Sequence, residues 1–134
     1  MTLDLVRLRR RRFLEDDSVV DPAGMRLYAM DAWVSDAAIL VDRDELQATL
    51  HAAARAGAAR VVGEAFHVFS NGAVTGVLVL AQSHLSIHTW PELRLANVDL
   101  LSYGAVDGPR VLAVIRERLG ADRANVELLE RAGA

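Results

Sequence analysis

Residues 73–90 read AVTGVLVLAQSHLSIHTW, an apolar run followed by a segment in which polar and apolar side chains alternate. A short apolar run is typical of a buried strand, and strict alternation is typical of a strand with one covered face. Pro91 ends the second strand, because proline cannot donate to a sheet ladder. Two strands in direct succession favour an antiparallel sheet.

The neighbouring segments continue this pattern. Strands are predicted at residues 24–34, 59–69 and 94–103, which are rich in β-branched and aromatic side chains or alternate in polarity. The SNG tripeptide at residues 70–72 is a turn signal after the second of them. The last segment, residues 124–134, is predicted to be weakly helical or an edge strand.

Two helices are expected. Asp42 and Glu45 have the spacing of a capping box with Asp in place of Ser or Thr, and Gly57 can close the helix that they open. A second helix lies between Pro109 and Gly120. The apolar faces of the two helices consist of Leu46, Leu50 and Ala53, and of Val111, Leu112, Ile115 and Leu119. This order predicts an α+β fold, a two-layer sandwich in which an antiparallel sheet carries its helices on one face.

The chain has 134 residues, of which 52% are hydrophobic, and this is the usual size of one domain. Residues 24–134 are predicted to form that domain, and residues 1–23 a charged N-terminal extension. A run of arginines at residues 7–12 fits RNA or lipid headgroups, but such a run is more often a solvated terminus. The net charge of −3 gives no general reason to expect nucleic acid as a partner. Because a small domain leaves much surface uncovered, oligomerisation is expected.

The chain contains no cysteine, which excludes disulfides, thiolate zinc sites and cysteine nucleophiles. No apolar run is long enough to predict a membrane span. The first residues carry charge without the apolar core of a secretory signal. The expected location is therefore the cytoplasm.

Residues 81–92, AQSHLSIHTWPE, contain several polar and aromatic side chains directly after the buried strand. A metal site at His84 and His88 is disfavoured, because four residues along a strand span roughly 13 Å and two ligands of one ion cannot lie so far apart. A serine hydrolase is disfavoured because Ser83 lies in AQSHL and not in a G-x-S-x-G elbow. No metal is expected.

In a third interpretation, Ser83 reacts with its own backbone. Its hydroxyl attacks the carbonyl of Gln82, and elimination and hydrolysis then leave a pyruvoyl group at position 83. This chemistry needs an acid–base group and a hydroxyl or amide that stabilises the oxyanion. His88 and Thr75 can fill these two roles. Alternation alone does not favour this interpretation over an ordinary strand with a satisfied histidine.

The stretch FSNGAVTGVLVLAQSHLSIHTWPE, followed by ANVDLLSYG, resembles the pattern of prokaryotic S-adenosylmethionine decarboxylase proenzymes. That family typically reads F-x-P-Q-G-V-S/T-G…E-S-H-x-S/T-I-H-T-W/Y-P-E…A-x-x-D-x-F-T-C-G. The match runs without gaps over residues 69–104, and residues 24–58 resemble the family's first strand and helix. The resemblance implies a proenzyme that cuts itself between Gln82 and Ser83 and so makes a pyruvoyl cofactor from Ser83.

The resemblance also implies roles for other residues. His88 assists the processing, and Thr75 supplies a supporting hydroxyl. The pyruvoyl group forms a Schiff base with the substrate amine and acts as the electron sink for decarboxylation. Phe69 and Trp90 occupy candidate positions for holding the adenine, and Glu92 matches the acid that holds the ribose hydroxyls. The family fold is an antiparallel sheet with helices on one face, and it forms a homodimer of cleaved protomers with active sites near the subunit interface.

The sequence departs from the family pattern at two positions. Gln82 stands where the family usually has Glu, but the electrophile there is a backbone carbonyl, so a neutral side chain does not prevent the acyl shift. Tyr103 stands where the family has the cysteine that is implied to return a proton to the decarboxylated carbon. A phenol is protonated at neutral pH and can donate, with a longer reach than a thiol. Tyr103 therefore replaces that acid, alters the pocket, or is only a packing residue.

Alternation raises a further question about the motif. Ser83 and His88 are five residues apart, so a regular strand points them to opposite faces. We expect either a kink or bulge between them, or a turn of the new chain end after the cut.

Three functions follow from these residues. The leading hypothesis is a self-processing decarboxylase of S-adenosylmethionine that supplies the aminopropyl donor for spermidine synthesis. The second keeps the pyruvoyl group but acts on ornithine or arginine, with Asp31, Asp99 or Glu92 holding the side-chain amine. The third is an uncleaved, non-enzymatic homologue that binds a partner or regulates an active relative.

Overall fold

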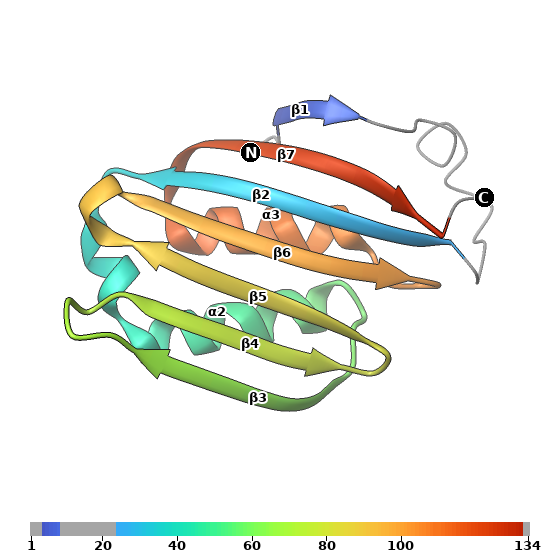
Figure 1. Ribbon diagram of the computed structural model, residues 1–134, viewed down its shortest axis with the longest axis horizontal. Coiled ribbons are helices and arrows are strands. Elements are labelled where there is room, and N and C mark those ends of the chain that lie inside the picture. The colour runs from blue at the N-terminus through green and yellow to red at the C-terminus, as the bar shows by residue number, and fades with distance from the viewer. Residues whose placement is uncertain (1–3, 9–23, 133–134) are drawn as a thin grey trace.

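The computed structural model describes residues 4–8 and 24–132 of the chain, which form one sheet with two α-helices on one of its faces (Figure 1). The strands are β1 (Asp4–Leu8), β2 (Met25–Val34), β3 (Val61–Val68), β4 (Val74–Leu80), β5 (Ser83–Trp90), β6 (Leu95–Tyr103) and β7 (Ala121–Arg131). The α-helices are α2 (Arg43–Ala56) and α3 (Gly108–Leu119), and the 3-10 helices are η1 (Ala37–Val41) and η2 (Pro91–Leu93). Within this part of the chain, neither α2 nor α3 is long and apolar enough to cross a membrane.

The strands lie in the order β1-β7-β2-β6-β5-β4-β3. Neighbouring strands of this described sheet run antiparallel, except β1 and β7, which run parallel. The prediction of an α+β fold, with an antiparallel sheet and helices on one face, is confirmed, and β1 is a parallel addition at one edge. β5 lies between β4 and β6, so the segment that carries Ser83 and His88 is paired on both sides.

Of the two alternatives predicted for residues 124–134, the helix is wrong, and the strand is right except that it does not lie at the edge of the sheet. β7 is an interior strand that pairs with β2 from Ala121 to Arg131 and with β1 on its other side. Ala124, Val126 and Leu128 are buried, and the residues between them are more exposed. Because every second residue is buried against the core, the segment must be a strand, although Leu128 and Leu129 also fit a helical spacing.

The N-terminal extension predicted at residues 1–23 is described only in part. Its residues 4–8 form β1, which adds to the sheet beside β7. Residues 1–3 and 9–23, which include most of the arginine run at residues 7–12, lie outside the described residues. The division into an extension and a domain stays a prediction.

The two helices begin and end where their capping residues predict. The Asp42 side chain accepts a hydrogen bond from the backbone N–H of Glu45 at 3.1 Å, and the N–H of Gly57 donates to the carbonyl of Ala53 at 3.0 Å. α3 ends at Gly120, whose φ of 67° is the left-handed conformation that glycine adopts without steric cost. The apolar faces predicted for both helices are buried in the core.

The sheet therefore has a covered face and an open face. Side chains that point toward α2 and α3 form the core, where Met30, Leu85, Ile87 and Leu100 are almost fully buried. On the opposite side, which we call the open face, no described element packs against the sheet (Figure 1). Cross-strand pairing and alternation assign to the open face Met25, Leu27, Asp31, Thr75, Val77, Val79, His84, Ser86, His88, Asn97, Asp99, Leu101 and Tyr103.

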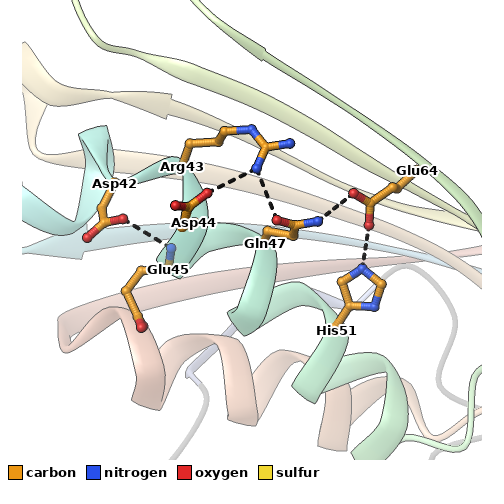
Figure 2. A network of polar contacts seen from close by, with 7 residues as sticks. All are labelled: Asp42, Arg43, Asp44, Glu45, Gln47, His51 and Glu64. Atoms are coloured by element: carbon orange, nitrogen blue, oxygen red, sulfur yellow. Dashed lines mark hydrogen bonds and ion pairs between the residues drawn. The ribbon is translucent and has the colours of Figure 1, made fainter.

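A polar network joins α2 to the outermost strand β3 on the covered side (Figure 2). Glu64 of β3 accepts a hydrogen bond from Gln47 Nε2 at 2.5 Å and contacts His51 Nε2 at 2.6 Å. Arg43 donates to Gln47 Oε1 at 3.0 Å, and its guanidinium lies 5.2 Å from the centroid of the Phe66 ring. These contacts stabilise the edge of the sheet that carries the turn into β4.

We predict that the His51–Glu64 contact contributes about 0.5 kcal/mol of coupling energy, because both side chains are only about two-thirds buried and solvent screens the pair. The measurement is a double-mutant cycle of urea unfolding with His51→Ala and Glu64→Ala. The Glu45–Arg118 pair, at 4.0 Å and more exposed, is the control and should give a coupling near zero. Equal coupling in both pairs would contradict the assignment.

Candidate active site

Ser83 is the first residue of β5 and follows the two-residue turn of Ala81 and Gln82. Leu80 and Ser83 are paired, so the turn joins β4 to β5 without extra residues. Gln82 has a φ of 62°. Ala81 and Gln82 are exposed, whereas the Ser83 hydroxyl is buried and has no hydrogen-bond partner among the described residues.

A buried hydroxyl without a partner is uncommon, since leaving it unpaired costs about 1–3 kcal/mol. Ser83 Oγ is therefore not committed to a structural hydrogen bond, and the carbonyl of Gln82 precedes it directly in the chain. These properties fit a serine that serves as the precursor of a pyruvoyl group, which forms from the hydroxyl and the preceding peptide bond.

Four of the other predicted site residues lie together at the far end of β4 and β5. Thr75 Oγ1 and His88 Nδ1 are 2.6 Å apart across these strands. The His88 ring meets the Trp90 ring edge-on, with centroids 4.4 Å apart, and the Phe69 ring at 5.9 Å. Glu92 follows Trp90 closely in η2 and is exposed. We call Phe69, Thr75, His88 and Trp90 the aromatic group.

Three further residues adjoin the aromatic group, and sequence reasoning did not place them there. The His67 ring lies 4.7 Å from the Phe69 ring. Trp90 Nε1 donates to Asn97 Oδ1 at 2.6 Å, and Asn97 Nδ2 donates to Asp31 Oδ1 at 2.7 Å. A polar chain from β2 through β6 therefore fixes the orientation of the indole.

The pairing register of the strands is the signal from which His67, Asn97 and Asp31 could have been placed beside the aromatic group. The SNG turn pairs His67 with Thr75, and the pairing of β5, β6 and β2 aligns His88, Asn97 and Asp31. All five then lie in one row across the sheet. Reading that row from sequence requires the strand order as well as the turns, and the strand order was not predicted.

Of the two alternatives expected for Ser83 and His88, the kink or bulge is wrong, and a turn of the new chain end after the cut stays a prediction. β5 pairs with β4 from Ser83 to His88, and with β6 from His84 to Trp90, without a register shift. Five residues of regular strand span about 16 Å, and they place the two side chains on opposite faces. Within one chain, His88 and Thr75 therefore do not reach Ser83.

Tyr103 lies at the end of the sheet that carries Ser83. Leu101 pairs with His84, so continuing the register places Tyr103 opposite Gln82, on the open face. The predicted site residues thus divide into two groups at opposite ends of β5. We call Gln82, Ser83 and Tyr103 the cleavage group, and it lies well apart from the aromatic group.

Asp99 lies on the open face between the two groups and pairs with Ser86. Burial among neighbouring side chains raises the pKa of the Asp99 carboxyl; nearby His84 lowers it, and nearby Asp31 raises it further. His84 and His88 both face this side, but they are four residues apart on a regular strand, or roughly 13 Å. In residues 4–8 and 24–132, no three His, Asp or Glu side chains lie close enough to hold a metal ion.

A family model described as S-adenosylmethionine decarboxylase matches residues 26–132. The chain belongs to the S-adenosylmethionine decarboxylase family. A curated relative from Acidithiobacillus ferrooxidans, named S-adenosylmethionine decarboxylase proenzyme, is 34% identical over 102 residues, which cover 75% of this chain and 77% of the relative. A relative of the same name from Pseudomonas paraeruginosa is 45% identical over 80 residues, or 59% of this chain. This match spans about half of that relative's length (50%).

A solved structure of this family has the same fold. The crystal structure of the adenosylmethionine decarboxylase from Aquifex aeolicus matches this chain with a TM-score of 0.72 and 30% sequence identity. The match covers 83% of this chain and 91% of that one. The sheet and its helices, which hold the cleavage and aromatic groups at their two ends, are therefore shared with a member of the S-adenosylmethionine decarboxylase family.

We predict that Asn97→Ala releases the Trp90 indole, because the ring loses the acceptor that orients its N–H. In a Trp33→Phe background, the remaining tryptophan emission should shift to the red and its anisotropy should fall. Asn125→Ala is the matched control, since Asn125 lies in the same row and pairs with Asp31. Unchanged emission in Asn97→Ala, with a native circular dichroism spectrum, would contradict the orienting role.

Proposed function

We propose that this chain is a self-processing decarboxylase of S-adenosylmethionine, which works through a pyruvoyl group made from Ser83. Its product, decarboxylated S-adenosylmethionine, serves as the aminopropyl donor for spermidine synthesis. The observation that carries this proposal is the buried, unpartnered Ser83 hydroxyl at the hairpin turn of a family member. The relatives are named proenzymes, which supports a chain that is synthesised as an inactive precursor and then processed. The proposed location is the cytoplasm.

Self-cleavage is an acyl shift followed by an elimination. Ser83 Oγ bonds to the carbonyl carbon of Gln82 while the peptide C–N bond breaks, and the hydroxyl proton ends on the Ser83 nitrogen. Loss of the Ser83 Cα proton then expels the Gln82 carboxylate and leaves dehydroalanine at position 83. One water then releases ammonia and leaves the ketone. The His88–Thr75 pair supplies the acid–base group and the hydroxyl that this chemistry needs.

The pyruvoyl group supplies a carbonyl that captures the substrate amine and accepts the electron pair left behind by carbon dioxide. The rings of Phe69 and Trp90, set edge-on to His88, offer their faces to the adenine. Glu92 accepts hydrogen bonds from the ribose hydroxyls. Tyr103, at the same end of the sheet as Ser83, returns a proton to the carbon that has lost carbon dioxide.

These roles require a second copy of the chain, because His88 and Ser83 of one protomer lie about 16 Å apart and on opposite faces. A two-fold axis that packs two open faces together, with β5 running in opposite directions, brings the partner's His88 to the open-face side of the Gln82–Ser83 peptide bond, opposite the side on which the Ser83 hydroxyl lies. We therefore propose a homodimer of cleaved protomers, in which each site combines one chain's cleavage group with the partner's aromatic group.

The open face has the composition of such an interface. Met25 and Val79 are 40% and 47% exposed, and Leu27 and Leu101 lie partly exposed between them. Grouped apolar side chains on one face of a small protein mark an interaction surface. Pairing two open faces removes these side chains from water and supports the proposed dimer.

A second candidate function is decarboxylation of a basic amino acid by the same pyruvoyl chemistry. The observation that favours it is the pair of carboxylates on the open face, Asp31 and Asp99, which lie close enough for Asp31 to raise the pKa of Asp99. A substrate ammonium or guanidinium would relieve this repulsion. Tyr103, in place of the smaller family cysteine, would reduce the room for an adenosyl group. Assays with S-adenosylmethionine, ornithine and arginine separate the two candidates.

We predict that the purified chain yields two fragments, one of them starting at position 83 with a pyruvoyl end, and that it releases carbon dioxide from S-adenosylmethionine. Intact-mass spectrometry and labelled carbon dioxide capture measure the two events. Ser83→Ala should abolish both, whereas Ser86→Ala, a serine substitution in the same strand, should leave both intact. A chain that stays whole after long incubation would instead support the uncleaved, non-enzymatic homologue.

Shared sites predict complementation between inactive variants. Ser83→Ala and His88→Ala should each stay uncleaved when produced alone. When the two are co-produced, the His88→Ala chain should be cut, because its Gln82–Ser83 peptide bond meets the partner's His88. The Ser83→Ala chain should remain whole in the same mixture. Mass spectrometry distinguishes the two chains, and absence of any cleavage in the mixed dimer would contradict a site shared between protomers.

A further inference from the structure

Gln82 adopts a backbone conformation that its side chain disfavours. Its φ of 62° lies in the left-handed region, which costs a residue with a Cβ about 1–2 kcal/mol. In a two-residue β-hairpin, glycine or asparagine normally occupies a position with positive φ. Gln82 fills this position although it has neither the missing Cβ of glycine nor the short amide of asparagine.

The turn is held so that this conformation cannot relax. On one side, the N–H of Ala81 donates to the carbonyl of Arg60 at 2.8 Å, which ties the turn to the segment before β3. On the other side, pairing of Leu80 with Ser83 begins the regular ladder between β4 and β5. Backbone strain persists only where the surrounding structure imposes it, and these contacts do so.

The strain acts at the Gln82 carbonyl group, which is the group that Ser83 attacks. In the left-handed conformation, a Cβ crowds the carbonyl oxygen that follows it, and at Gln82 this is the oxygen of the carbonyl that Ser83 attacks. When the carbonyl carbon becomes tetrahedral, its oxygen leaves the peptide plane and moves away from Cβ. Breaking the C–N bond then frees the residue from the hairpin.

We infer that the left-handed backbone of Gln82 is a strained positioning device that speeds self-cleavage by destabilising the intact Gln82–Ser83 peptide bond. This inference rests on the proposed function and assigns to Gln82 a role that its side chain does not carry. The step it accelerates is the acyl shift, in which the bond from Ser83 Oγ to the Gln82 carbonyl carbon forms and the peptide C–N bond breaks. The hydroxyl proton passes to the Ser83 nitrogen, and no further reactant is needed.

The test compares substitutions that differ only in how well they tolerate positive φ. Gln82→Gly removes the strain and should slow cleavage about fivefold or more, since 1.36 kcal/mol corresponds to a factor of ten in rate. Gln82→Asn, which tolerates this region better than Gln, should be intermediate. Gln82→Ala keeps a Cβ at the same φ and should cleave faster than Gln82→Gly.

Two measurements separate strain from a merely structural effect. Cleavage is followed by intact mass from the first appearance of the folded precursor, and Tm is measured for each variant in a Ser83→Ala background. Gln82→Gly should cleave more slowly while its precursor is as stable as, or more stable than, the Gln82 precursor. Ala132→Gly is the matched control, because Ala132 has a φ of 52°, is exposed and follows β7, which is not adjacent to β4 or β5. It should leave the cleavage rate unchanged.

The outcomes distinguish this inference from the proposed function. If the wild-type chain is cut and Gln82→Gly is cut equally fast or faster, the strain has no role and the self-processing proposal stands. If Gln82→Ala is as slow as Gln82→Gly, the glutamine side chain acts instead of the backbone, and the inference is overturned. If the wild-type chain is never cut, the proposed function itself fails.

Discussion

The regular pairing of β5 with β4 on one side and β6 on the other is the constraint on which the rest of the structure depends. It fixes which side chains of the reactive segment enter the core and which face outward, because a one-residue slip would exchange the two sets. It also joins the end of β4 to the start of β5 by a two-residue turn, in which Gln82 adopts the left-handed conformation. The same ladder keeps Ser83 and His88 of one chain apart.

This regular pairing places the polar residues of the motif in two separate groups. At one end of β5, a hydroxyl is buried without a partner beside a peptide bond. At the other end, His88 contacts Thr75 and the indole of Trp90, and the indole N–H donates to Asn97. Neither end contains a complete set of reacting groups. Chemistry that needs both ends would have to combine groups from two copies, as in the proposed dimer.

The sequence predicts most of the architecture, because strands with one buried face leave a period of two and amphipathic helices leave a period near four. The sequence did not decide between a helix and an edge strand at the C-terminal segment, because Val126, Leu128 and Leu129 fit either period, and only pairing with β2 decides between them. β1 was missed because its charged segment suggests solvation. For the candidate site, the motif predicts which side chains take part, and this stays a prediction.

The grouping and geometry of the candidate site residues were harder to predict from the sequence. The row that joins His67 and Asn97 to the aromatic group depends on strand order, which local patterns do not encode. The left-handed backbone of Gln82 could not be predicted either, since glutamine has no preference for that conformation. Both features arise from tertiary pairing, and they are the features that distinguish one end of β5 from the other.

The strand order has a consequence for a chain cut between Gln82 and Ser83. The first fragment would hold β1, β2, β3 and β4, and the second β5, β6 and β7, yet in the sheet β2 lies between β7 and β6 (Figure 1). The two pieces are interleaved, so neither can depart without breaking strand ladders on both sides of β2. Unfolding would then separate two molecules, and recovery would depend on their concentration. Such a protein would refold poorly once diluted, even though its folded form is held together along whole strands.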